Sequence, residues 1–175
     1  LIASARPRSR STVEKRVTAV RAFLRYLIAQ GQCPTDLDQA VPIQAHWRLA
    51  SLPRSLTSKQ LEQLIAACEG DSCHRRRDRA IILLLARLGL RAGDVARMRL
   101  GDIEWDSATL RICGKGRYEV RLPVPQDVGE AVIDYLQCRP SGVQSDKLFL
   151  RTIAPFGPFV SGDGVSSVVT RALVR

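Results

Sequence analysis

The stretch RDRAIILLLARLGLRAGDVARMRLGDI (residues 77–103) decides the fold of this chain. Residues 74–88 begin with basic side chains and continue through an isoleucine and leucine run, so apolar side chains occur on every side of the predicted helix. A helix that is apolar all round belongs in the middle of a core. Gly89 ends this helix, because glycine adopts the left-handed conformation common at helix C-termini. A short helix over 92–98 is predicted directly afterwards.

Beyond this stretch the apolar residues change from a helical period to a period of two. Apolar and polar residues alternate over 109–113 and over 119–124, with the glycine-rich segment 114–117 between them. This pattern predicts a β-hairpin, and a short strand over 103–105 is expected beside it. Further on we expect a helix over 127–138, an edge strand over 148–150 and a last helix over 164–174. The order predicts an α+β domain that is mostly helical, with a small three-stranded antiparallel sheet.

Before residue 74 the sequence predicts two more helices, separated by a linker. Apolar residues at a three-four spacing over 11–30 predict an amphipathic helix that Gly31 ends, followed by one short helical turn over 36–40. Prolines at positions 42 and 53 and the lack of periodicity over 41–54 predict a linker.

After the linker, Thr57 and Gln60 have the spacing of a capping box, and the helix that they begin should close at Gly70 and Asp71. We place the domain boundary near Pro53. Residues 1–52 would be the C-terminal part of a larger helical domain plus the linker, and residues 53–175 the α+β domain.

The charge of the chain indicates a polyanionic partner. The 27 Lys and Arg residues exceed the 17 Asp and Glu residues, for a net charge of +10, which favours nucleic acid over a membrane surface. A basic protein without such a partner remains the alternative on composition alone. Arginine suits bidentate phosphate contact, and the candidate DNA contacts are Arg6, Arg8, Arg10, Arg16, Arg75, Arg76, Arg77 and Arg117.

Other features argue against a membrane protein, a secreted protein and a metalloprotein. The longest apolar run, residues 80–86, is far shorter than the roughly 20 residues of a membrane-spanning helix. The odd, scattered set of five cysteines argues against a disulfide framework and is typical of a protein in the reducing cytoplasm. Cys68, Cys73 and His74 lie close in sequence, but a fourth ligand at a familiar zinc spacing is missing. We therefore expect no metal and no cofactor. The sequence begins at Leu1 without an initiator Met and closes at Arg175 without a recognisable end signal, so we expect it to be cut at both ends.

The junction after the buried helix holds the first residues that could carry chemistry. Gly89 should hold Arg91 at a defined place on the surface, and Asp94, three residues on, can share a helical face with it. An oriented guanidinium can stabilise charge on the non-bridging oxygens of a phosphoryl-transfer transition state, a contribution of roughly 3 to 4 kcal/mol. The alternative is a surface ion pair worth under ~1 kcal/mol.

Lys115 is the second candidate. Flanked by Gly114 and Gly116, it lies on a bendable loop and could donate a proton to a departing oxygen, which gives roughly 10² to 10⁴ in rate. The alternative is a solvated turn lysine. The segment is not a nucleotide-binding P-loop, because Gly116 stands where that motif has Ser or Thr.

Several segments in this order resemble the first half of the catalytic domain of the tyrosine recombinase (phage integrase) family. They are residues 77–85, 89–95, 100–103, 112–116 and 121–125. Residues 12–31 and 52–57 resemble the last helix of the all-α core-binding domain of that family and the linker beyond it. Each motif alone is weak, and their order and spacing are specific. The resemblance covers nearly the whole chain.

The resemblance implies roles for three residues. Arg91 matches the first catalytic arginine, which neutralises the scissile phosphate, and Lys115 matches the hairpin lysine that protonates the leaving 5′ hydroxyl. Asp94 matches the supporting acidic residue, usually Glu in the family. The remaining His-x-x-Arg motif, a His or Trp, and the tyrosine nucleophile should follow Arg175.

Residues that could be mistaken for this missing part are present but badly placed. His74 and Arg77 spell His-x-x-Arg ahead of Arg91, the wrong order. None of the tyrosines is expected to be the nucleophile; they are Tyr26, Tyr118 and Tyr135.

The family reaction attacks a DNA phosphodiester with tyrosine, giving a 3′-phosphotyrosyl bond and a free 5′ hydroxyl, and needs neither ATP nor a metal. The resemblance implies double-stranded DNA as the partner, a tetramer of the intact protein on DNA, and a mobile-element setting. This chain alone is expected to bind DNA without cleaving it. Two alternatives remain open: a non-catalytic DNA-binding regulator with half a recombinase fold, and a relative of type IB topoisomerases.

Overall fold

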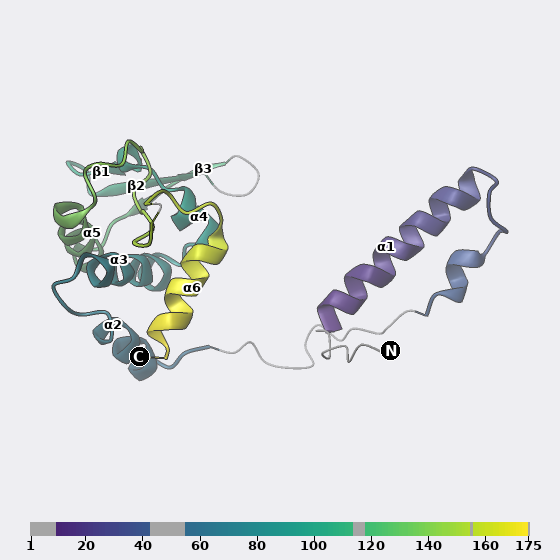
Figure 1. Ribbon diagram of the computed structural model, residues 1–175, viewed down its shortest axis with the longest axis horizontal. Coiled ribbons are helices and arrows are strands. Elements are labelled where there is room, and N and C mark those ends of the chain that lie inside the picture. Colours follow the sequence, from purple (N-terminus) through teal and green to yellow (C-terminus); the bar gives the residue numbers. More distant parts are fainter. Residues whose placement is uncertain (1–9, 43–54, 114–117, 155, 175) are drawn as a thin grey trace. The chain divides into compact units, whose positions relative to one another are not determined.

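The computed structural model describes residues 10–42, 55–113, 118–154 and 156–174, without the side chains of Arg10 and Ser11 (Figure 1). The chain divides into two compact units, Leu1–Arg54 and Ser55–Arg175.

The first unit contains helix α1 (Arg10–Ala29) and the 3-10 turn η1 (Leu37–Ala40). Gly31, at φ 69°, follows α1 in the left-handed conformation, which is the predicted end signal. The guanidinium of Arg25 donates to the Asp38 carboxylate at 2.9 Å and lowers the pKa of that carboxyl. None of the described side chains of this unit is buried, so the described residues of the unit form no core around the apolar side chains of α1.

The second unit is an α+β domain with α3 (Cys73–Leu88) at its centre. The remaining elements are α2 (Ser58–Ala66), α4 (Ala92–Arg97), η2 (Leu100–Asp102), β1 (Ile103–Glu104), β2 (Thr109–Cys113), β3 (Glu119–Pro123), α5 (Gln126–Cys138) and α6 (Gly162–Ala172). The antiparallel sheet has the order β1-β2-β3, and α3 packs against α2, α4, α5 and α6. The predicted fold class, including the three-stranded sheet, is confirmed.

The core explains the central position of α3. Residues Ala80 to Leu84 are at most 2% exposed, and they pack with buried side chains of α4, α5 and α6. Helix α3, which is apolar on every side, therefore has packing partners on every side, as predicted. Helix α2 begins as predicted, with a complete capping box between Thr57 and Gln60.

Two predicted elements differ in the structure. Helix α2 ends at Ala66 and not at Gly70, because the hydrogen-bond pattern after Ala66 is no longer α-helical. The amide of Cys68 donates to the Ile65 carbonyl, three residues back, at 3.0 Å. The edge strand expected over 148–150 is wrong. Leu148 and Leu150 are both 1% exposed and their amides donate to Met98 and to the Tyr135 hydroxyl, so this segment is a buried connection and not a strand.

Candidate functional site

Arg91 lies where α3 gives way to α4. Gly89 caps α3 at φ 62°, and Arg91 is the extended residue that precedes α4. The Arg91 carbonyl accepts hydrogen bonds from the amides of Asp94 (2.8 Å) and Val95 (3.1 Å), which ties the backbone of Arg91 to the first turn. The side chain is 75% exposed. The local sequence therefore fixes the backbone while the guanidinium stays exposed to solvent.

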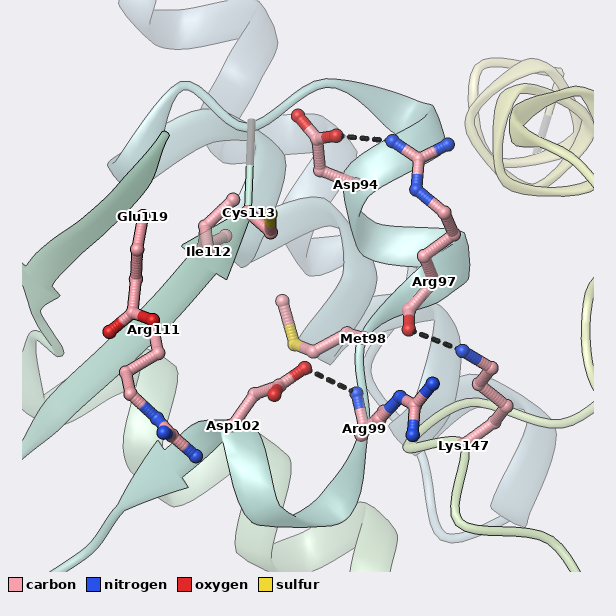
Figure 2. A pocket seen from close by; sticks show the side chains of 10 residues that line it. All are labelled: Asp94, Arg97, Met98, Arg99, Asp102, Arg111, Ile112, Cys113, Glu119 and Lys147. Carbon is pink, nitrogen blue, oxygen red and sulfur yellow. Dashed lines mark hydrogen bonds and ion pairs between the residues drawn. The ribbon is translucent and has the colours of Figure 1, made fainter. Parts of the chain in front are cut away.

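Asp94 is a buried carboxylate that two exposed arginines share. Its side chain is 7% exposed, and Arg97 Nη2 lies 2.6 Å from Oδ1 (Figure 2). Arg91 Nη1 lies 3.9 Å from Oδ2. The sequence predicted the Arg91–Asp94 pair, and the structure brings the two together. It also shows a closer partner, Arg97, which the sequence reasoning missed although Arg97 stands three residues after Asp94, the spacing of neighbours on a helix.

The position of α4 depends on a close approach of backbones. A Cβ on Gly162, the first residue of α6, would lie 2.8 Å from the backbone nitrogen of Gly93. Only glycine allows the two helices to approach so closely. Helix α6 thereby holds the first turn of α4, and with it Asp94.

A pocket of about 300 Å³ opens beside α4 (Figure 2). Its lining comes from α4, the two residues after it, η2, the hairpin strands and Lys147. The lining residues are Asp94, Arg97, Met98, Arg99, Asp102, Arg111, Ile112, Cys113, Glu119 and Lys147. Cys113 and Glu119 form the pair at the end of the β2–β3 ladder. Lys115 and Arg117 fall between them in the sequence, outside the described residues. The carboxylate beside Arg91 and the described residues on either side of the hairpin connection therefore line one pocket.

The pocket lining contains four cations and three carboxylates. Most of the cations have partners other than Asp94. Arg99 pairs with Asp146 at 2.9 Å, Arg111 Nη2 donates to the Gly101 carbonyl at 2.9 Å, and Lys147 Nζ donates to the Arg97 carbonyl at 2.8 Å. Among the described residues, no group of three or more His, Cys, Asp or Glu side chains is placed to hold a metal ion.

The predicted DNA contacts have different surroundings. Arg6, Arg8 and Arg117 lie outside the described residues, and the side chain of Arg10 is not described. Arg16 is exposed on α1. Arg75 is exposed and donates to the Glu69 carbonyl at 2.7 Å, and Arg76 is half-buried, 3.7 Å from Asp71.

Arg77 contradicts the expectation of a surface contact. Its side chain is 2% exposed and pairs with the buried Asp78. Nη1 also donates to the Leu150 carbonyl at 3.0 Å and to the Thr152 hydroxyl at 3.2 Å. Consecutive basic residues on a helix point in different directions, so one of them can face the core. The neighbouring Asp78, which can pair with a buried arginine, was the one sign in the sequence that Arg77 is that residue. Arg77 is a core residue that ties α3 to the chain after α5.

The tyrosines occupy unlike environments. Tyr135 is 1% exposed, its hydroxyl accepts a hydrogen bond from the Leu150 amide, and burial raises its pKa. Tyr26 is 59% exposed on α1, and Tyr118 is 78% exposed just before β3.

None of the helices among the described residues has the length and hydropathy of a membrane span.

Comparison with known proteins gives consistent results. The phage integrase family matches residues 54–172. A Sinorhizobium fredii protein named integrase/recombinase y4rA is 44% identical over 160 residues, which are 90% of this chain and 38% of that protein. The tyrosine recombinase XerD of Halalkalibacterium halodurans is 29% identical over 129 residues, 74% of this chain and 42% of XerD. The chain thus spans less than half the length of these two relatives.

A solved structure has the same fold. The lambda integrase tetramer bound to a Holliday junction matches with a TM-score of 0.64 and 20% sequence identity, over 94% of this chain and 47% of that one.

Proposed function

The chain belongs to the phage integrase family, and we propose that the protein containing it breaks and rejoins DNA at specific sites through a 3′-phosphotyrosyl intermediate. The observation that supports this proposal is the set of residues that line the pocket beside α4. Asp94, which lies beside Arg91, and the residues flanking the Lys115 hairpin line the same 300 Å³ space. A phosphodiester there would meet an arginine from one motif and a lysine from the other.

Arg91 would neutralise the scissile phosphate. Negative charge grows on the two non-bridging oxygens as the nucleophile attacks, and a guanidinium can donate to both at once. The 75% exposure of the side chain leaves it accessible, and Asp94, 3.9 Å away, limits its orientations. Asp94 would act through Arg91 and would not touch the DNA itself.

Lys115 would complete the proton balance. The tyrosine hydroxyl releases its proton to solvent as its oxygen forms a bond to phosphorus. The bond from phosphorus to the 5′ oxygen breaks, and that oxygen takes a proton from the lysine ammonium. One phosphodiester is exchanged for another, so the energy for rejoining stays in the covalent intermediate and ATP is not consumed.

The nucleophile would be a tyrosine outside these 175 residues. Tyr135 is buried with its hydroxyl engaged, and Tyr26 belongs to the other unit. Tyr118 precedes β3, in the hairpin that would supply the general acid. We therefore propose that the chain by itself binds DNA and does not cleave it.

The first unit would be the C-terminal part of a helical DNA-binding domain, the core-binding domain. Exposed apolar residues on α1, such as Phe23 at 59%, fit a helix that packs into a larger bundle. Its remaining candidate contacts are Arg6, Arg8, Arg10 and Arg16, and those of the second unit are Arg75, Arg76 and Arg117. By analogy with the lambda integrase tetramer on a Holliday junction, we propose that the intact protein acts as a tetramer on duplex DNA in the cytoplasm.

Fluorescence anisotropy with a labelled duplex of about 30 base pairs tests the proposal on the 175-residue chain. We expect the dissociation constant to rise with salt concentration. Arg91→Ala should reduce the steepness of the plot of log association constant against log salt concentration by about 0.9, the value for one phosphate contact. Arg87→Ala is the control, because Arg87 has a similar exposed ion pair with Asp127 and no place in the site. Absence of duplex binding, or equal slopes for Arg91→Ala and wild type, would overturn the proposal.

A further inference from the structure

We propose that Arg97 binds a DNA phosphate of its own, separate from the phosphate that Arg91 neutralises, and that Asp94 holds both arginines in place. This inference rests on the proposed DNA-strand-transfer function. It adds a residue to the site on the basis of three observations.

The first observation is a charge imbalance around Asp94. One carboxylate faces two guanidinium groups, Arg97 at 2.6 Å and Arg91 at 3.9 Å. The carboxylate is 7% exposed, whereas the side chains of Arg97 and Arg91 are 67% and 75% exposed. One positive charge thus remains uncompensated at this surface, which attracts an anion.

The second observation concerns the other cations of the pocket. Arg99, Arg111 and Lys147 have carboxylate or carbonyl partners away from Asp94. The contact described for the Arg97 guanidinium is the one to Asp94, made through Nη2. A guanidinium has five N–H donors in a rigid fork, so most of its donors remain for a phosphate.

The third observation is that the backbone makes room for this guanidinium. A Cβ on Gly93 would lie 3.3 Å from Arg97 Nη1, so the side chain lies back over the first turn of α4. In that position the guanidinium stays on the pocket rim beside Asp94 (Figure 2). Arg97 is therefore held on the same side of α4 as the carboxylate that it shares with Arg91.

Two other roles would explain the same contacts. Arg97 could be a plain ion-pair partner with no part in binding, or it could act only by setting the position of Arg91 through Asp94. A cycle of variants in the 175-residue chain separates the three roles: wild type, Arg91→Ala, Arg97→Ala and the double variant. Each is titrated with the same labelled duplex at four salt concentrations, and thermal melting checks its fold.

A separate phosphate contact predicts additive slopes. Arg97→Ala should reduce the steepness of the plot of log association constant against log salt concentration by about 0.9. The double variant should reduce it by about 1.8. Arg97→Lys should keep the wild-type slope, because the charge is retained. Arg87→Ala should match wild type.

The contrary outcomes differ from one another. If Arg97→Ala keeps the wild-type slope, or the double variant equals Arg91→Ala alone, the Arg97 proposal is overturned while the proposed function stands. If wild type fails to bind the duplex, the proposed function fails, and the Arg97 proposal fails with it.

Discussion

Arg77 and Asp78 form an ion pair inside the core, with side chains 2% and 1% exposed. The guanidinium also donates to Leu150 and Thr152 and lies 5.4 Å from the centre of the Phe159 ring. Hydrogen bonds to the backbone offset the desolvation of such a pair, but removal of one partner leaves a buried charge uncompensated.

Arg77→Ala should therefore lower the free energy of unfolding by about 3 to 5 kcal/mol. Arg87→Ala, which breaks an exposed pair with Asp127, should change it by less than about 1 kcal/mol. Urea denaturation of both variants measures the difference. Similar small losses in the two would mean that the Arg77 pair does not stabilise the core.

Cys73 is a residue with a large pKa shift. Burial raises the pKa of its thiol from 9.0 to about 12, and a side-chain hydrogen bond with Cys138 adds to the rise. The thiol also donates to the backbone carbonyl of Cys138, 2.7 Å away. Folding thus favours the protonated thiol. The stabilisation is complete below pH 9.0 and is lost as the pH rises toward about 12.

Raising the pH from 9.0 toward 12 should destabilise the wild-type chain more than Cys73→Ala, because the variant has no thiol to deprotonate. Tyr135, whose pKa is also raised, titrates in both proteins, so their difference reports on Cys73. Urea denaturation across this range gives the two curves. Parallel curves would show that the thiol titrates alike in the folded and unfolded chains.

At the residue scale, the sequence predicts the Arg91–Asp94 contact between near neighbours, but it does not predict the contacts of Arg77 with residues distant in the chain. Arg91 and Asp94 are three residues apart, and their proximity follows from helix geometry. The burial of Arg77 depends on Leu150 and Thr152, more than 70 residues away. No local pattern records that contact.

At the scale of elements, glycines set the ends of the helices that build the site. Gly89 has φ +62°, and a Cβ there would meet nothing within 4 Å. A substitution at this position is therefore opposed by backbone conformation alone.

Gly89→Ala should lower the free energy of unfolding by about 1 to 2 kcal/mol, the cost of the left-handed conformation for a residue with a Cβ. Gly101→Ala is the matched control, because its Cβ also meets nothing and its φ is not left-handed. Thermal denaturation compares them. Equal stability of the two variants would rule out the left-handed turn as the reason for glycine at 89.

Gly162 represents the opposite case, in which space is limiting. Its Cβ would approach the backbone of Gly93 to 2.8 Å, so Gly162→Ala must push α6 away from α4 at a cost of about 1 to 3 kcal/mol. Gly129→Ala, inside α5 with an ordinary 3.7 Å contact, should instead stabilise by about 0.5 to 1 kcal/mol. Urea denaturation of both is the measurement, and a stabilising Gly162→Ala would contradict the close approach.

Most elements could be predicted because local rules determine them: the capping box of α2, the apolar surface of α3, the alternation in β2 and β3. The segment 148–150 could not. Three consecutive apolar residues are compatible with a strand, and only the partners of their amides, Met98 and Tyr135, decide the matter.

At the scale of the whole molecule, the net charge of +10 and the cations of the pocket beside α4 both favour the proposed DNA ligand. The excess of arginine would provide the general attraction to DNA, and the arginines around Asp94 the placement of single phosphates. The sequence alone predicted the partner class but not the pocket, because the pocket joins α4, the hairpin and Lys147 across the fold.

Covalent capture tests the central claim most directly. The intact protein is incubated with sheared DNA from its source, and detergent-resistant protein–DNA adducts are counted and mapped by peptide mass spectrometry. We predict adducts through a tyrosine other than Tyr26, Tyr118 and Tyr135, reduced about 10² to 10³-fold by Arg91→Ala. Adducts that form undiminished in Arg91→Ala, or that map to one of those three tyrosines, would contradict the account.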